Sequence, residues 1–126
     1  MDKKIAVLII EDETDLRKML EYRLIINGFK VYSAADGSAG LKMAKEKRPD
    51  VILLDWVMPE VNGLEVLLKI RHDDTTKDII VFMLTGKNMM DDVSTALANG
   101  ANDYIPKPVD GAELGQRIMS MIEVFR

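Results

Sequence analysis

The sequence predicts an α/β protein in which a five-stranded parallel sheet carries helices on both faces. Two observations support this prediction. Apolar runs such as Val51-Ile52-Leu53-Leu54 are unbroken, which is typical of strands buried on both faces. Strand-like and helix-like segments alternate five times, which is typical of a parallel sheet. Right-handed crossovers between such units leave few topologies.

The expected elements follow one another along the whole chain. Strands are expected where apolar side chains cluster, at residues 4–10, 29–34, 51–55, 78–84 and 103–105. Helices are expected where apolar residues recur at helical spacing, at residues 14–27, 36–47, 63–72, 88–98 and 112–124. Lys30 and Ser33 make the second strand more polar, which predicts an edge position. Leu64, Leu67, Leu68 and Arg71 are expected to fall on one face of the third helix.

Capping and breaking residues set the expected ends of the helices. Asp12 or Thr14 is the candidate N-cap of the first helix, and Asn27-Gly28 closes it. Asp36-Gly37 begins the second helix, and Arg48-Pro49-Asp50 ends it and leads into the central strand.

Composition limits the classes of protein to be considered. The 126 residues are expected to form one domain, residues 1–126, and 48% of them are apolar. No apolar run approaches the roughly 20 residues that span a membrane, and no signal peptide is recognised. The absence of cysteine suits a reducing, cytoplasmic location. The net charge of −4 argues against direct binding of nucleic acid.

Chemically active side chains stand at the carboxyl ends of four expected strands. Glu11 and Asp12 follow the first strand, Asp55 ends the third, Thr85 follows the fourth, and Lys107 follows the fifth. Parallel strands bring these ends to one edge of the sheet, where ligands bind in open α/β proteins. Taken alone, Asp55 fits a residue that only caps a turn better than it fits a functional group. The convergence of all five groups predicts a site.

Such a site has a specific electrostatic requirement. Two carboxylates about 4 Å apart repel by about 4 kcal/mol at an effective dielectric constant near 20, so three of them call for a cation. Oxygen ligands without histidine or cysteine favour Mg²⁺ or Mn²⁺. A metal, a lysine, a hydroxyl and a carboxylate nucleophile are the components of phosphoryl transfer onto an aspartate.

One set of residues occurs in the order and spacing of a known family. The set comprises Glu11-Asp12, Asp55 with Met58-Pro59 and Gly63, Thr85-Gly86, Gly100-Ala101, Tyr104 and Lys107-Pro108. Across essentially all 126 residues the chain resembles the receiver domain of two-component response regulators. The resemblance implies a doubly wound, flavodoxin-like sheet with strand order 2-1-3-4-5.

The resemblance also implies roles for the residues of the site. Asp55 corresponds to the phosphoacceptor. Glu11 and Asp12 correspond to the acids that hold Mg²⁺, and the backbone carbonyl of Val57 corresponds to a further ligand. Lys107 would pair with Asp55 and then with its phosphoryl group.

The same resemblance implies a conformational switch. Thr85 would move to bond a phosphoryl oxygen, Tyr104 would turn inward, and the Lys107-Pro108 peptide would be cis. Gly86 departs from the alanine that is usual in the family and is expected to loosen this loop. Glu11 departs from the more usual aspartate.

Val57 and Lys87 occupy positions that tune phosphoryl lifetime in the family. Apolar Val57 offers no amide to orient water, so we expect slow self-dephosphorylation. Trp56, next to Asp55, is expected to report metal or phosphoryl binding through its fluorescence. His72 is interpreted as a solvated helix end.

The expected partners are a sensor histidine kinase or phosphotransfer protein and a downstream effector or linked output domain. The output face implied by the resemblance consists of the fourth helix, fifth strand and fifth helix. Asp103, Glu113 and Arg117 match charges that pair two receivers in many relatives, which suggests a phosphorylation-dependent homodimer. Val93 stands where a basic partner is usual, so Asp103 and Arg117 are expected to pair within one chain or remain solvated.

Other functions fit the sequence less well. A magnesium phosphohydrolase commonly carries a second acid two residues beyond its nucleophile, where this chain has Val57. A degenerate receiver that binds partners constitutively would not need Asp55, Glu11-Asp12 and Lys107. A nucleotide- or flavin-binding module is disfavoured because acids, and no glycine-rich loop, follow the first strand.

Overall fold

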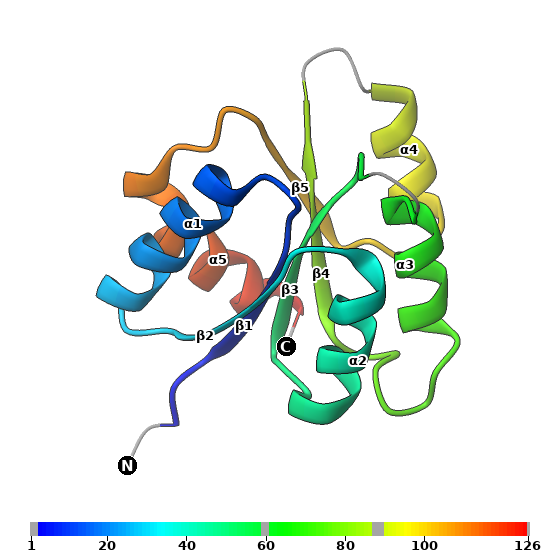
Figure 1. The fold of residues 1–126 in the computed structure, drawn as a ribbon, viewed down its shortest axis with the longest axis horizontal. Helices are drawn as coiled ribbons and strands as arrows, with labels where there is room; N and C mark the ends of the chain where they lie inside the picture. Colours follow the sequence, from blue (N-terminus) through cyan, green and yellow to red (C-terminus); the bar gives the residue numbers. More distant parts are fainter. Residues whose placement is uncertain (1–2, 59–60, 87–89, 126) are drawn as a thin grey trace.

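The structure, a computed structural model, describes residues 3–58, 61–86 and 90–125. The strands are β1 (Ala6–Ile10), β2 (Lys30–Ala34), β3 (Val51–Asp55), β4 (Ile80–Thr85) and β5 (Asp103–Pro106). The helices are α1 (Thr14–Ile26), α2 (Gly37–Lys47), α3 (Gly63–Arg71), α4 (Met90–Ala98) and α5 (Gly111–Phe125). The strands form one parallel sheet in the order β2-β1-β3-β4-β5 (Figure 1). The predicted doubly wound, flavodoxin-like topology is therefore confirmed.

Two hydrophobic cores lie on opposite faces of this sheet. Alternate residues of each central strand point to opposite faces, so Ile52 and Leu54 of β3 face one core while Val51 and Leu53 face the other. Helices α2, α3 and α4 cover the first core, and α1 and α5 cover the second (Figure 1). All five residues of β3 are buried, as its unbroken apolar run predicts.

The predicted N-cap residue is correct for α2 and wrong for α1. The Asp36 side chain accepts a hydrogen bond from the Ala39 N–H at 2.8 Å, as expected of an N-cap. The prediction of Asp12 or Thr14 as the N-cap of α1 is wrong, because Glu13 occupies that position without a side-chain capping bond. The expected start of α4 at Asn88 lies outside the described residues.

Of the four residues expected to share one face of α3, Leu67 is buried and Leu64, Leu68 and Arg71 are partly buried. The buried residues of the helix are Gly63, Val66, Leu67 and Ile70, whereas Leu64 is only partly buried. Gly63, the first residue of the helix, packs closely against the backbone of Trp56.

Arg71, the last residue of α3, ties together segments that are distant in sequence. Its Nε donates to the Gly100 carbonyl at 2.9 Å, and its Nη1 donates to the carbonyls of Ile79 and Lys77 at 2.6 and 2.9 Å. Its Nη2 donates to the Asn102 side chain at 3.0 Å. These bonds fix the connection between α4 and β5 against the start of β4.

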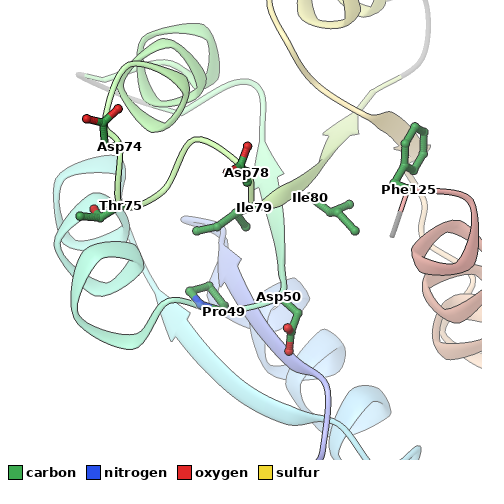
Figure 2. A pocket seen from close by; sticks show the side chains of 8 residues that line it. All are labelled: Pro49, Asp50, Asp74, Thr75, Asp78, Ile79, Ile80 and Phe125. Atoms are coloured by element: carbon green, nitrogen blue, oxygen red, sulfur yellow. The ribbon is translucent and has the colours of Figure 1, made fainter.

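The two edges of the sheet differ in chemistry. A pocket of about 250 Å³ lies at the amino ends of β3 and β4, with Asp50, Asp74 and Asp78 on its wall and Phe125 of α5 opposite (Figure 2). The groups predicted to do chemistry lie at the other edge, where the strands end. Among the described residues, no helix has the length and apolar character needed to cross a bilayer.

Candidate functional site

Three carboxylates from two strand ends lie close together. Glu11 follows β1 and is fully buried, Asp55 ends β3 and is 2% exposed, and Asp12 is exposed. One carboxylate oxygen from each lies within 4.8 Å of the others. The parallel register places these residues side by side, since Ile10 pairs with Leu54. The predicted convergence of Glu11, Asp12 and Asp55 is present.

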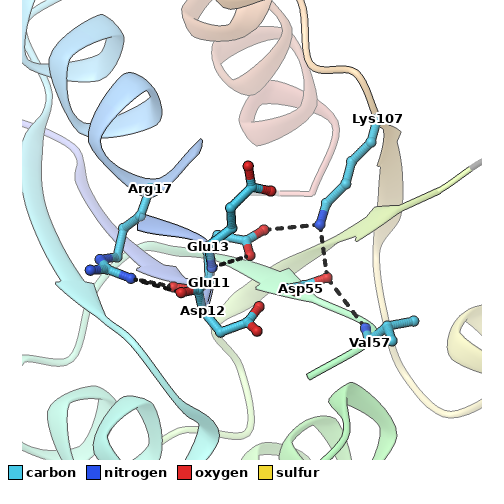
Figure 3. Close-up of polar contacts among 7 residues, drawn as sticks. All are labelled: Glu11, Asp12, Glu13, Arg17, Asp55, Val57 and Lys107. Carbon is cyan, nitrogen blue, oxygen red and sulfur yellow. Dashed lines mark hydrogen bonds and ion pairs between the residues drawn. The ribbon is translucent and has the colours of Figure 1, made fainter. Parts of the chain in front are cut away.

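Lys107 provides the positive charge of this cluster. Its Nζ donates to Asp55 Oδ1 at 3.1 Å and lies 3.0 Å from Glu11 Oε1 (Figure 3). Its backbone N–H donates to the Thr85 carbonyl at 2.6 Å, which places it beside the end of β4. The Lys107-Pro108 peptide is cis, as the resemblance implies. One ammonium therefore faces two buried carboxylates.

The cluster perturbs its own ionisation. Burial, followed by the negative charge of Glu11, raises the pKa of Asp55 from 3.8 to about 7, although Lys107 acts in the opposite direction. Burial lowers the pKa of Lys107, but the carboxylates of Glu11 and Asp55 outweigh this effect and raise it overall. Lys107 thus stays charged, while a pKa of about 7 leaves Asp55 only partly ionised near neutral pH.

The donor set fits a hard divalent cation. Carboxylate oxygens are the ligands that Mg²⁺ and Mn²⁺ prefer, and the described part of the cluster contains neither histidine nor cysteine. Glu11 Oε1 is buried, makes no hydrogen bond of good geometry within the described residues, and lies 3.0 Å from the Lys107 ammonium. A cation between the acids would satisfy this oxygen and relieve the repulsion.

The segment after β3 shapes the other side of the site. The Val57 N–H donates to Asp55 Oδ1 at 3.3 Å, while the Val57 side chain is 63% exposed. Trp56 is buried, and its carbonyl accepts from the Gly63 N–H at 3.0 Å. A Cβ on Gly63 would lie 2.7 Å from the Trp56 Cα, so glycine is required for this close approach. Asp55 Oδ2 accepts no hydrogen bond in the described part of the chain.

Neither of the two expected switch residues makes a hydrogen bond to Asp55 within the described residues. Thr85 is buried, and its Oγ1 donates to the Gly86 carbonyl at 3.0 Å. Tyr104 is half-buried on β5, where it pairs in register with Met83 and packs against the core under α4. Lys87, expected to tune phosphoryl lifetime, lies outside the described residues.

The charges on the expected output face do not form the expected pair. Arg117 donates to the Tyr104 carbonyl at 2.7 Å, and Asp103 accepts from the Tyr104 N–H at 2.8 Å. No ion pair between Asp103 and Arg117 occurs among the described residues, and Arg117 is exposed, which fits the solvated alternative and not the intramolecular one. Val93 is buried, consistent with an apolar residue there.

Sequence reasoning missed Arg17. Its Nη1 donates to the Glu11 carbonyl at 2.8 Å and to the Asp12 carbonyl at 3.4 Å, beneath the loop that carries both acids (Figure 3). Its position could have indicated a role, because Arg17 is the fourth residue of α1 and basic residues are disfavoured near the amino end of a helix.

A doubly wound parallel sheet that gathers acids, a lysine and a threonine at its carboxyl edge is the arrangement that the resemblance to receiver domains predicts. Comparison with known families agrees with this prediction. The model of the response regulator receiver domain family matches residues 7–119. The chain therefore belongs to the response regulator receiver domain family of two-component systems. Members of this family are signalling domains and not turnover enzymes.

The chain is similar to several curated regulators. It is 40% identical to the transcriptional regulatory protein AfsQ1 of Streptomyces coelicolor over 117 residues, which covers 93% of this chain and 51% of that protein. It is 36% identical to the phosphate regulon transcriptional regulatory protein PhoB of Escherichia coli over 116 residues, covering 92% and 51%. The chain thus spans about half the length of the curated relatives it matches.

Solved structures of response regulators have the same fold. The chemotaxis protein CheY4 of Vibrio cholerae superposes with a TM-score of 0.89 at 28% identity, covering 94% of this chain and 99% of that one. A response regulator receiver domain protein from Clostridium thermocellum superposes with a TM-score of 0.86 at 30% identity, covering 95% of each chain.

Proposed function

We propose that residues 1–126 form one receiver domain that accepts a phosphoryl group on Asp55 in a Mg²⁺-dependent reaction. The donor is a sensor histidine kinase or a phosphotransfer protein. The observation that carries the proposal is the position of Asp55, whose carboxylate stands between two further acids and Lys107 at the carboxyl edge of the sheet. Asp55 Oδ1 already accepts bonds from Lys107 and Val57, which leaves Oδ2 as the attacking oxygen.

The residues of the site divide the chemistry among them. Asp55 forms the new oxygen–phosphorus bond as the bond from phosphorus to the donor's nitrogen breaks, and the departing imidazole takes up a proton. Glu11, Asp12, Asp55 and the Val57 carbonyl would hold Mg²⁺, which would supply positive charge for the phosphoryl oxygens. Lys107 donates to the phosphoryl group from the opposite side.

Ionisation of Asp55 links metal binding to reactivity. With its pKa near 7, Asp55 is largely protonated at slightly acid pH and a poor nucleophile. Positive charge at the acid cluster lowers that pKa and releases the carboxylate for attack. Metal binding therefore also activates Asp55 as the nucleophile.

Phosphorylation is proposed to switch the face formed by α4, β5 and α5. Thr85 Oγ1, which now donates to the Gly86 carbonyl, would turn to a phosphoryl oxygen, and Tyr104 would move into the space it leaves. Contacts made only in the phosphorylated state then shift the population toward it. A downstream effector protein or a linked output domain reads this face, and a phosphorylation-dependent homodimer is a further outcome.

The proposal places the domain in the cytoplasm and assigns it no direct contact with nucleic acid or membrane. Its net charge of −4 supports a protein partner over DNA. The only catalysis proposed is phosphoryl uptake and loss on Asp55 itself.

Trp56 fluorescence tests the proposal because Trp56 is the single tryptophan and adjoins Asp55. We expect one change on adding MgCl₂ and a second on adding acetyl phosphate to the metal-loaded protein. Asp55→Asn should abolish the second change. The outcome that contradicts the proposal is a spectrum insensitive to both additions, or a second change that persists in Asp55→Asn.

A further inference from the structure

Within the described residues, Arg17 makes hydrogen bonds only to the backbone of the acid-bearing loop, residues 11–13. Its Nη1 donates to the carbonyls of Glu11 and Asp12 at 2.8 and 3.4 Å, so one guanidinium nitrogen reaches back from α1 to both residues (Figure 3). No ion pair involving Arg17 is found among residues 3–58, 61–86 and 90–125. A cation beside three carboxylates would ordinarily pair with one of them.

The start of α1 lacks the usual means of holding such a loop. Glu13 is the N-cap residue, but its side chain makes no capping hydrogen bond. Hydrogen bonds on two sides of the loop contribute to holding it instead. The Glu13 N–H donates to Glu11 Oε2 at 3.0 Å, and Arg17 holds the carbonyls on the other side. Glu11 is thus fixed at both its carboxylate and its backbone.

We propose that Arg17 is a positioning residue for the divalent cation site, acting through the backbone of the β1–α1 loop. This inference rests on the proposed function of the same site. By holding the Glu11 and Asp12 carbonyls, Arg17 keeps both carboxylates directed toward Asp55 in the metal-free protein. The cation then binds a preformed set of oxygens and does not have to order the loop.

Charge alone predicts the opposite effect. A guanidinium near the site repels Mg²⁺, so removing the charge of Arg17 should tighten metal binding if electrostatics dominates. If positioning dominates, the same removal should weaken binding, because the loop carbonyls lose their donor. The two roles therefore differ in sign and not merely in size.

The experiment measures the Mg²⁺ dissociation constant by Trp56 fluorescence for wild type, Arg17→Met and Arg17→Lys. Arg17→Met keeps much of the side-chain length and removes the charge and all donors. We expect about tenfold weaker binding, the lower end of the effect of losing a group that orients metal ligands. Arg17→Lys keeps the charge but not the planar guanidinium, and should weaken binding severalfold.

Lys18→Met is the matched control. Lys18 is the exposed neighbour on α1, so this variant removes the same charge without touching the loop. We expect its dissociation constant to stay within about twofold of wild type. If Arg17→Met binds Mg²⁺ as tightly as Lys18→Met or more tightly, the positioning role is refuted. Weaker binding in Arg17→Lys than in Arg17→Met would also refute it, because lysine keeps both the charge and a donor for the loop carbonyls.

A metal-free measurement separates positioning from general damage. Hydrogen exchange of the Glu13 N–H should accelerate in Arg17→Met and not in Lys18→Met, while exchange in β3 stays slow in both. Unchanged exchange at Glu13 in Arg17→Met overturns the inference. If wild type itself shows no Mg²⁺ response, the proposed function fails. If wild type responds and both methionine variants match it, only the role of Arg17 fails.

Discussion

Without metal, ionised Asp55 should destabilise the fold, so Asp55→Asn should stabilise it at alkaline pH. The folded pKa is about 7 and the ordinary value is 3.8. Between these values the folded state binds more protons than the unfolded state, so the free energy of unfolding falls as pH rises. Asparagine cannot ionise and therefore does not undergo this loss.

The size of the effect follows from the shift. At about 1.4 kcal/mol per pKa unit, the full shift corresponds to at most about 4 kcal/mol. About three-fifths of it, at most about 2.6 kcal/mol, falls between roughly pH 5 and pH 8, and solvent at the open side of the cluster screens part of this change. We therefore expect the stability of Asp55→Asn relative to wild type to rise by about 1.5 to 2 kcal/mol over that range.

Urea unfolding followed by circular dichroism in the presence of EDTA measures this difference at each pH. Asp74→Asn is the control, because that carboxylate is 97% exposed at the opposite edge of the sheet and should give a flat profile. Saturating Mg²⁺ should raise the free energy of unfolding of wild type by RT ln(1 + [Mg²⁺]/Kd). The increase for Asp55→Asn should be smaller. A difference that does not change with pH, or that increasingly favours wild type as pH rises, would refute the reasoning.

Three further variants test particular contacts. Gly63→Ala places a Cβ against the Trp56 backbone and should cost about 2 to 3 kcal/mol in urea unfolding; a loss under about 0.5 kcal/mol would contradict the packing. Arg71→Met leaves the Gly100 carbonyl without its donor and should lower the free energy of unfolding by about 2 to 3 kcal/mol. An unchanged free energy of unfolding would contradict the stabilising role of the Arg71 hydrogen bonds. Val57→Asn should shorten the phosphoryl lifetime measured by intact mass after donor removal, and decay of wild type within seconds would argue against slow self-dephosphorylation.

The sheet could be predicted from sequence because its signals are local and strong. The unbroken apolar run of β3 implies burial on both faces, and the parallel topology brings the strand ends to one edge. That geometric consequence suffices to gather Glu11, Asp12, Asp55 and Lys107 at one edge from their sequence positions alone.

Side-chain direction could not be predicted, because it depends on contacts between distant segments. The N-cap of α1 falls on Glu13 because Glu11 and Arg17 hold the loop from both sides. Arg117 binds the Tyr104 carbonyl and not a nearby acid, a choice that residue spacing does not encode.

The proposed function requires that Asp55 accept a phosphoryl group when a divalent cation is present. Intact mass after incubation with acetyl phosphate tests this for wild type and Asp55→Asn, each with Mg²⁺ and with EDTA. We expect a gain of one phosphoryl group in wild type with Mg²⁺ and in none of the other three samples. The same gain in Asp55→Asn, or in wild type with EDTA, would contradict the account.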